Sequence, residues 1–127
     1  MYKRQVLLGN GNDSIAVGTG NDTLSLGSGH DTLSAAGGND VVLVAVGADY
    51  AATDTVGLGA GTDFVRFTST TPSDLLTLNS TLTATGGHLT IEASDASGVL
   101  TGTTALQINA SAVTQAITLL GLSLIHI

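Results

Sequence analysis

The sequence predicts an all-β fold built as a β-solenoid, in which short strands and turns wind into stacked coils. Two observations support this prediction. A nine-residue unit repeats four times in succession near the start of the chain, and aspartate, glycine and apolar residues each return at a fixed position in it. The composition is poor in aromatic residues (3%) and rich in glycine (17 residues), so any core must be thin and built from small aliphatic side chains.

Each unit follows the template G-x-G-N-D-x-φ-x-φ, where φ is an apolar residue. In the D-x-φ-x-φ half, alternation places the two apolar side chains on one face of a short strand. The G-x-G-N half is a turn, because glycine and then asparagine best tolerate the left-handed backbone region. His30 replaces this asparagine once, and we interpret it as a tolerated turn residue rather than a metal ligand. The four units occupy residues 9–17, 18–26, 27–35 and 36–44.

One strand and one turn make half a coil, so two units complete a coil and return the chain about one strand spacing further along the axis. Aspartates two units apart then lie above one another, and the expected stacks are Asp13 with Asp31 and Asp22 with Asp40. Stacked carboxylates repel one another unless a cation lies between them. Calcium suits this position better than magnesium, because it accepts about six to eight oxygens, backbone carbonyls included, in flexible geometry.

The four units resemble the calcium-binding nonapeptide repeats of RTX proteins, the hemolysin-type repeat, whose template is G-G-x-G-x-D-x-U-x. The aspartates match the family's ligand aspartate. The resemblance implies a parallel β-roll in which each Ca²⁺ ion lies between turns of adjacent coils, held by carboxylates and glycine-turn carbonyls. Two departures are an apolar residue in place of the family's first glycine, which lengthens the strand, and Ala36 in place of another glycine. The candidate calcium-binding residues are Asp13, Asp22, Asp31, Asp40, Gly9, Gly11, Gly18, Gly20, Gly27, Gly29, Gly38, Asn12, Asn21 and Asn39.

The nine-residue interval continues beyond the fourth unit but changes phase. Asp49 keeps the interval, although its turn has lost most of its glycines, and a further good unit surrounds Asp63. Asp54 lies nine residues before Asp63, so the register slips by five residues between Asp49 and Asp54. We interpret the slip as a bulge or small loop in one coil. Asp49 is then a further candidate ligand paired with Asp31, and Asp63 a lone site near the end of the stack; plain turn structure is the alternative for both.

The chain is expected to divide into a calcium-binding β-roll over residues 6–67 and a Thr- and Ser-rich β-solenoid or irregular β region over residues 68–121. In the second part, alternation predicts strands at 75–78, 88–93 and 105–110.

Three finer expectations concern this second part. Residues 89–94 resemble residues 106–111, seventeen residues on, which predicts a coil of nearly that length. Glu92 is expected to face solvent from its strand. A short helix at residues 110–120 is conceivable, but a strand is favoured there.

The two ends, residues 1–5 and 122–127, are expected not to be native. Met-Tyr-Lys-Arg-Gln and Leu-Ser-Leu-Ile-His-Ile resemble translations of one DNA-sequencing adapter, read outward on one strand and inward on the other. Such segments are excluded from fold reasoning. The remaining chain is therefore expected to be an internal fragment, and one of its partners is the remainder of a larger parent chain.

The charge balance argues against several kinds of partner. Ten acidic residues face three lysines and arginines, and outside the expected adapter segments only Arg66 is basic. Such a chain cannot neutralise phosphates, so neither nucleic acid nor direct membrane insertion is expected. Cysteine is absent, which excludes thiolate metal sites. No nucleophile–base pair or paired catalytic carboxylates appear, so we do not expect an enzyme.

The predicted function is calcium binding by repeats that fold on calcium, within a larger secreted or cell-surface bacterial protein. The resemblance implies this setting, because calcium in that family lets a chain cross the cell envelope unfolded and fold outside. One alternative is a passive spacer, adhesin or S-layer-like surface filament. Another is the accessory repeat domain of a secreted hydrolase. Any cell-surface or host ligand is unidentified.

Overall fold

The computed structural model describes residues 2–95, 97–99 and 106–121, and within them the chain is built from parallel β-strands and one short 3-10 helix. The predicted parallel β-roll or β-solenoid is confirmed. The expected adapter segment 122–127 lies outside the described residues, whereas Gln5 of the first expected adapter segment begins a strand. The elements are β1 (Gln5–Leu7), β2 (Ser14–Thr19), β3 (Thr23–Ser25), β4 (Thr32–Gly37), β5 (Val41–Val44), η1 (Gly47–Asp49), β6 (Thr55–Gly57), β7 (Thr62–Phe67), β8 (Leu75–Thr77), β9 (Leu82–Thr83), β10 (His88–Ala93), β11 (Gln107–Asn109) and β12 (Ile117–Leu120).

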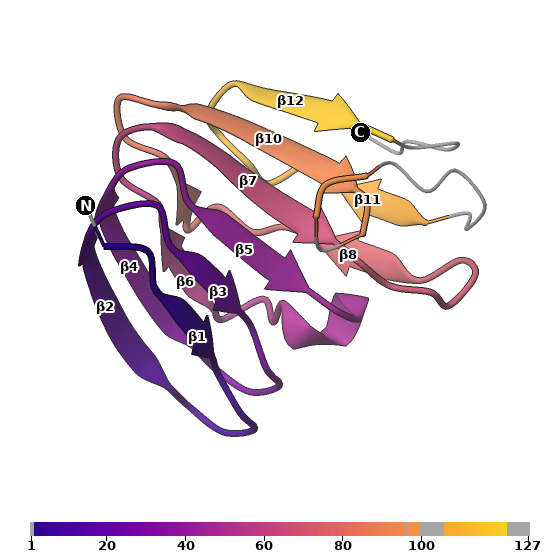
Figure 1. Ribbon diagram of the computed structural model, residues 1–127. Coiled ribbons are helices and arrows are strands. Elements are labelled where there is room, and N and C mark those ends of the chain that lie inside the picture. The colour runs from indigo at the N-terminus through magenta and orange to yellow at the C-terminus, as the bar shows by residue number, and fades with distance from the viewer. Residues whose placement is uncertain (1, 96, 100–105, 122–127) are drawn as a thin grey trace.

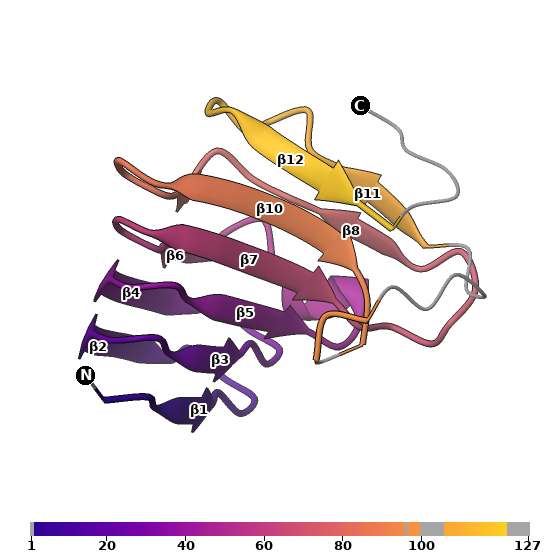
Figure 2. The ribbon, with the colours of Figure 1, turned by 45° about the horizontal axis from the view of Figure 1, so that its top comes forward.

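The strands form three sheets, here called A, B and C. Sheet A has the order β1-β3-β5-β7-β10-β12, sheet B the order β2-β4-β6-β9, and sheet C pairs β11 with β8. Figures 1 and 2 show the strands of sheet A stacked one above another along the solenoid axis, with sheet B beside them. Each early coil therefore gives one strand to sheet A and one to sheet B, with the core between them.

The length of a coil can be read from the register of paired strands. In the nonapeptide region Gln5 pairs with Thr23 and Thr23 with Val41, so each coil has 18 residues, which is two units. From β5 to β7 the offset becomes 23 residues, since Val41 pairs with Phe64. The extra residues lie between β5 and β6, in the segment that contains η1.

The core consists of aliphatic columns that run along the axis. In sheet A, Leu24 pairs with Val42, Val42 with Val65, and Val65 with Ile91, and all four side chains are fully buried. Sheet B repeats this pattern on the other side of the core. The apolar residues that end the four units are buried too: Val17, Leu26, Ala35 and Val44. Because the side chains alternate with a period of two, each strand needs only one or two such residues to close its part of the core.

The second part of the chain continues the solenoid with longer coils. The strands expected at 75–78 and 88–93 are present as β8 and β10, and β12 is the strand favoured over a helix near the C-terminal end. The expected seventeen-residue coil is wrong. β11 pairs with β8 of sheet C rather than with β10, and β10 pairs instead with β12, Leu89 with Ile117.

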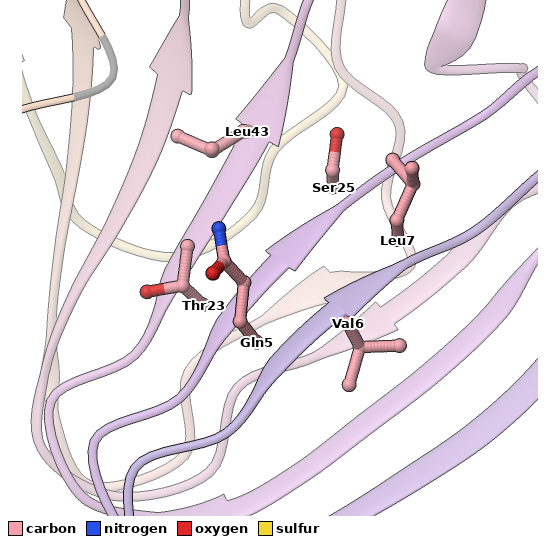
Figure 3. Close-up of a pocket in the computed structure, with 6 residues that line it drawn as sticks. All are labelled: Gln5, Val6, Leu7, Thr23, Ser25 and Leu43. Carbon is pink, nitrogen blue, oxygen red and sulfur yellow. The ribbon is translucent and has the colours of Figure 1, made fainter.

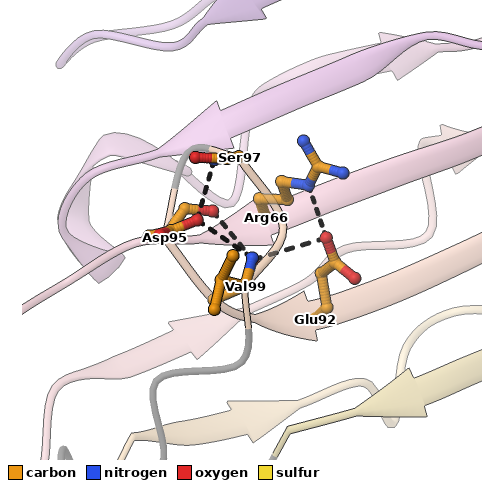
Figure 4. A network of polar contacts seen from close by, with 6 residues as sticks. Arg66, Glu92, Asp95, Ser97 and Val99 are labelled. Atoms are coloured by element: carbon orange, nitrogen blue, oxygen red, sulfur yellow. Dashed lines mark hydrogen bonds and ion pairs between the residues drawn. The ribbon is translucent and has the colours of Figure 1, made fainter.

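The expectation that Glu92 faces solvent is also wrong. Glu92 points away from the core, but its residue is only 4% exposed, because it forms an ion pair with Arg66 of the neighbouring strand β7 (Figure 4). The Arg66 guanidinium also lies 5.2 Å from the ring centroid of Phe64, and the loop at Gly98 packs against it. The basic residue of β7 and the acidic residue of β10 thus bury each other under the loop that follows β10.

Two neighbouring leucines in β8 test whether side chains in the second part of the chain alternate between the core and the outer face. Leu76 is fully buried and pairs with Ile108, whereas Leu75 is 44% exposed. We expect Leu76→Ala to lower the free energy of unfolding by about 2–5 kcal/mol, because it leaves a cavity in the core. Leu75→Ala, the matched control, should cost less than about 1 kcal/mol. Urea unfolding followed by circular dichroism measures both, and equal losses would contradict the assigned register.

Candidate metal centre

The aspartates of the repeat stack in two columns, one on each edge of the solenoid. The first aspartate column contains Asp13, Asp31 and Asp54, and the second contains Asp22, Asp40 and Asp63. Neighbours in a column belong to successive coils, 18 or 23 residues apart. All but Asp13 are at most 1% exposed, an unusual degree of burial for carboxylates.

In four of the stacked aspartates, one carboxylate oxygen accepts a hydrogen bond from the aspartate of the preceding coil. In the first column the backbone N–H of Asp13 donates to Asp31 Oδ1 at 3.1 Å, and that of Asp31 to Asp54 Oδ1 at 2.8 Å. In the second column Asp22 donates to Asp40 Oδ1 at 2.8 Å, and Asp40 to Asp63 Oδ1 at 3.0 Å. A backbone donor that points along the axis is thereby paired with a charged acceptor.

In four of the stacked aspartates, the other carboxylate oxygen has no partner among the described residues. The Oδ2 atoms of Asp22, Asp31, Asp40 and Asp63 are buried and have no hydrogen-bond partner within the described part of the chain. An unpaired charged oxygen inside a protein costs several kcal/mol unless a counter-charge compensates it. This set of oxygens fits a hard cation such as calcium, which prefers oxygen ligands.

The turns bring backbone carbonyls close to the same edges. A Cβ placed on Gly29 would lie 1.8 Å from the Gly11 carbonyl oxygen, and one on Gly38 would lie 2.0 Å from that of Gly20. Gly29 also has a φ of 138°, in the region that side chains disfavour. Only glycine lets successive turns approach so closely. The stacked turns therefore offer carbonyl oxygens next to the aspartate columns.

The turn asparagines form a second set of links between coils. Asn12 Oδ1 accepts from the His30 backbone N–H at 3.2 Å, and Asn21 Oδ1 accepts from that of Asn39 at 2.9 Å. Asn39 Oδ1 accepts in turn from the Thr62 N–H. Their amide oxygens are thus engaged in joining the coils. His30 occupies one step of this series, as the turn interpretation of that residue predicts.

The structure brings together most, but not all, of the expected site residues. Asp54, not Asp49, lies over Asp31, so the expected pairing of Asp49 is wrong; Asp49 lies instead in η1. The expected lone position of Asp63 is also wrong, because it stacks on Asp40. Gly18 lies within β2 rather than in an open turn. Pairs of turn glycines face each other across successive coils, among them Gly9 and Gly27, Gly11 and Gly29, Gly20 and Gly38, and Gly38 and Gly61.

The sequence contains one signal that Asp54 belongs to a column. Asp54 shares the nine-residue phase of Asp63. Once the coil is known to have 23 residues, both aspartates fall onto the columns together.

Within residues 2–95, 97–99 and 106–121, no three His, Asp or Glu side chains converge on one point. Any cation here would therefore take many of its oxygens from the backbone. The described residues also contain no helix long and apolar enough to cross a membrane. A shallow pocket on the outer face of sheet A has a volume of about 440 Å³ (Figure 3) and is lined by Gln5, Val6, Leu7, Thr23, Ser25 and Leu43. It has no charged side chain and does not suit a cation.

Burial shapes the electrostatics of the second column. It raises the pKa of Asp63 to about 6; the Asp40 backbone N–H opposes this rise, and the Asp40 charge adds to it. Burial likewise raises the pKa of Asp40. The hydrogen bond from the Asp22 backbone N–H opposes this rise, and the Asp22 charge adds to it. Burial also raises the pKa of Asp49, and the charges of Asp74 and Asp31 add to the effect. Without a cation, these carboxylates are held in the fold at a cost.

Comparison with known proteins agrees with this geometry. The fold and the site define a parallel β-roll with a carboxylate column on each edge. Residues 8–42 match the family model of the RTX calcium-binding nonapeptide repeat, in four copies. This match supports the repeat family that the four units resemble, and it ends before Asp54 and Asp63. No curated protein and no solved structure matches the chain.

A substitution in one turn tests the close approach of the coils. Gly29→Ala places a methyl group 1.8 Å from the Gly11 oxygen at positive φ, and we expect it to lower the free energy of unfolding by about 3 kcal/mol or more. A Cβ on Gly9 would meet nothing within 4 Å, so Gly9→Ala is the control and should change stability by less than about 1 kcal/mol. Thermal unfolding in excess calcium measures both. Similar melting temperatures for the two variants would show that the turns are not in contact.

The raised pKa values predict how stability depends on pH when calcium is removed. A carboxyl whose folded pKa lies above its unfolded value of about 3.9 favours folding in its protonated form, so its contribution is lost as the pH rises towards 6. In chelator, the chain should therefore melt at a higher temperature near pH 5 than near pH 7.5. Asp63→Asn should reduce this difference and raise the free energy of unfolding near pH 7.5 by roughly 1–2 kcal/mol. A melting temperature that increases with pH in chelator would contradict the assignment.

Proposed function

We propose that this chain binds calcium ions between its coils and folds when it does so. The observation that carries the proposal is the set of buried, unpartnered Oδ2 atoms on Asp22, Asp31, Asp40 and Asp63. Each lies in a column whose neighbouring carboxylate is one coil away. A divalent cation offsets both the burial of these charges and their mutual repulsion.

The chain's own residues divide the work of holding the ion. The Oδ2 atoms of the columns supply the negative charge, while their Oδ1 atoms stay bonded to the backbone of the neighbouring coil. The carbonyls of the glycine turns supply neutral oxygens. When bound, calcium would supply positive charge to the columns; Arg66, the basic residue nearest to them in sequence, is paired with Glu92 instead. The binding free energy then becomes folding free energy.

The setting we propose is a structural module of a larger secreted or cell-surface bacterial protein, without a catalytic role. Extracellular calcium is about millimolar, which suits weak sites of this kind. The calcium-binding part would be residues 6–67, because the columns end at Asp54 and Asp63. The same module would serve equally as the accessory repeat domain of a secreted hydrolase.

The second half of the chain favours one further function, a passive spacer or surface filament. In the described residues beyond Asp63, neither column gains another aspartate. The coils there are closed by buried aliphatic residues such as Leu76, Ile91 and Ile108. If the coils beyond Asp63 need no cation, they would stay stacked when the calcium concentration falls, and this part of the solenoid would keep its length.

A calcium titration followed by circular dichroism tests the proposed function. In chelator, we expect the nonapeptide part to give a weaker β-signal that is lost at a lower temperature than in calcium, because its charges are uncompensated and its core is thin. Calcium at roughly millimolar concentration should restore the β-signal. At a concentration 100-fold above its dissociation constant, each independent site adds about 2.7 kcal/mol to the free energy of unfolding.

Magnesium is the matched control, and it should restore less structure at equal concentration because it demands tight octahedral geometry. A full β-signal in chelator, unchanged when calcium is added, would overturn the proposal and leave the passive spacer as the better description.

A further inference from the structure

The first aspartate column ends differently from the second. Both carboxylate oxygens of Asp54 already have backbone donors: Oδ1 accepts from the Asp31 N–H at 2.8 Å and Oδ2 from the Ala51 N–H at 2.7 Å. In Asp63, at the end of the second column, Oδ2 has no partner within the described part of the chain. Asp54 is therefore satisfied by the protein itself.

The turn before Asp54 also differs from the turns of the repeat. Residues 50–53 contain no glycine, whereas each of the four units has glycine in its turn. The carbonyls of this turn nevertheless point to a common atom. The Nδ2 atom of Asn79 lies 3.3 Å from Ala51 O, 3.2 Å from Ala52 O and 2.8 Å from Asp54 O.

Asn79 is held firmly in this position. Its Oδ1 atom accepts from the hydroxyl of Tyr50 at 3.1 Å, from the Thr81 backbone N–H at 3.2 Å and from the Thr81 hydroxyl at 2.7 Å. The Thr81 hydroxyl also contacts the Asp54 carbonyl oxygen. Tyr50 is buried, which keeps its hydroxyl protonated and able to donate. The direction of the Asn79 amide is thereby fixed, with its oxygen towards the donors and its nitrogen towards the carbonyls.

Three carbonyl oxygens that converge on one point are the kind of ligand set that calcium accepts, but here the positive end of a side-chain amide occupies that point. We propose that Asn79 takes the place of a calcium ion at the end of the first column, so that no ion binds between Asp54 and the next coil. Asn79 thus determines where cation binding stops on this edge, while the second column remains open at Asp63. This inference rests on the proposed calcium function.

The test compares two variants of Asn79 in the full chain. Asn79→Asp keeps the acceptor for Tyr50 but turns a carboxylate oxygen towards the three carbonyls, which creates a place for a cation. Asn79→Ala removes the donor without adding a ligand. The number of calcium ions bound per chain is measured by equilibrium dialysis, together with the melting temperature in chelator and in calcium.

We expect Asn79→Ala to bind the same number of ions as the wild type and to lose a similar amount of melting temperature with and without calcium. Asn79→Asp should bind one additional ion, and its loss of melting temperature should be large in chelator and mostly recovered in calcium. Asn79→Asp with the wild-type ion count, and with equal losses in both conditions, overturns the proposal.

A second variant keeps the inference testable if Asn79→Asp does not fold. Asp54→Asn should lower the number of bound ions by less than Asp40→Asn does, because both oxygens of Asp54 already have backbone donors. A loss in Asp54→Asn as large as that in Asp40→Asn would make Asp54 a ligand on both of its sides and would contradict the role of Asn79. A wild-type chain that binds no calcium contradicts the proposed function itself, whereas a calcium-binding wild type with an unchanged Asn79→Asp variant contradicts only the present inference.

Discussion

The bond from the backbone N–H of one aspartate to the Oδ1 atom of the aspartate one coil further on is the interaction on which the rest of the structure depends. It fixes the register of the coils and holds the accepting carboxylate, as in Asp31 and Asp40, in a buried position against the neighbouring turn. Burial in turn leaves the Oδ2 atom without a donor in four of the six column members. The same contact that orders the stack therefore creates its need for positive charge.

Because the core is thin, the need of the aspartate columns for positive charge has a large effect on the free energy of folding. A single aliphatic position per strand, such as Leu24, Val42 or Val65, closes much of the inner space of a coil. So little apolar surface leaves a small margin over the conformational entropy that folding removes. A few uncompensated charges are enough to reverse that balance. In the later coils, aliphatic burial replaces the charges, and the coils become longer.

Periodic residues could be placed from the sequence, and non-periodic contacts could not. The fixed interval of the aspartates predicted the stacking of Asp13 on Asp31 and Asp22 on Asp40, which the interstrand hydrogen bonds confirm. Asp49 was misplaced because the interval alone does not say which half of a coil holds the extra residues. Glu92 was expected to face solvent, but the ion pair with Arg66 that covers it depends on the register between strands that are distant in sequence. The local partner of the Asn79 side chain is Thr81, and its partners among residues 50–54 are 25 to 29 residues away, so no local pattern indicates its role.

The five-residue insertion between β5 and β6 has a consequence for how such a solenoid changes over time. It lies entirely before Asp54, so Asp54 and Asp63 keep their spacing and both columns stay aligned in the longer coil. Loop length and column alignment are therefore separable properties of this architecture. An evolving gene, or a protein engineer, can lengthen one corner of a coil to display new sequence there, while the stacked edges on either side keep their order.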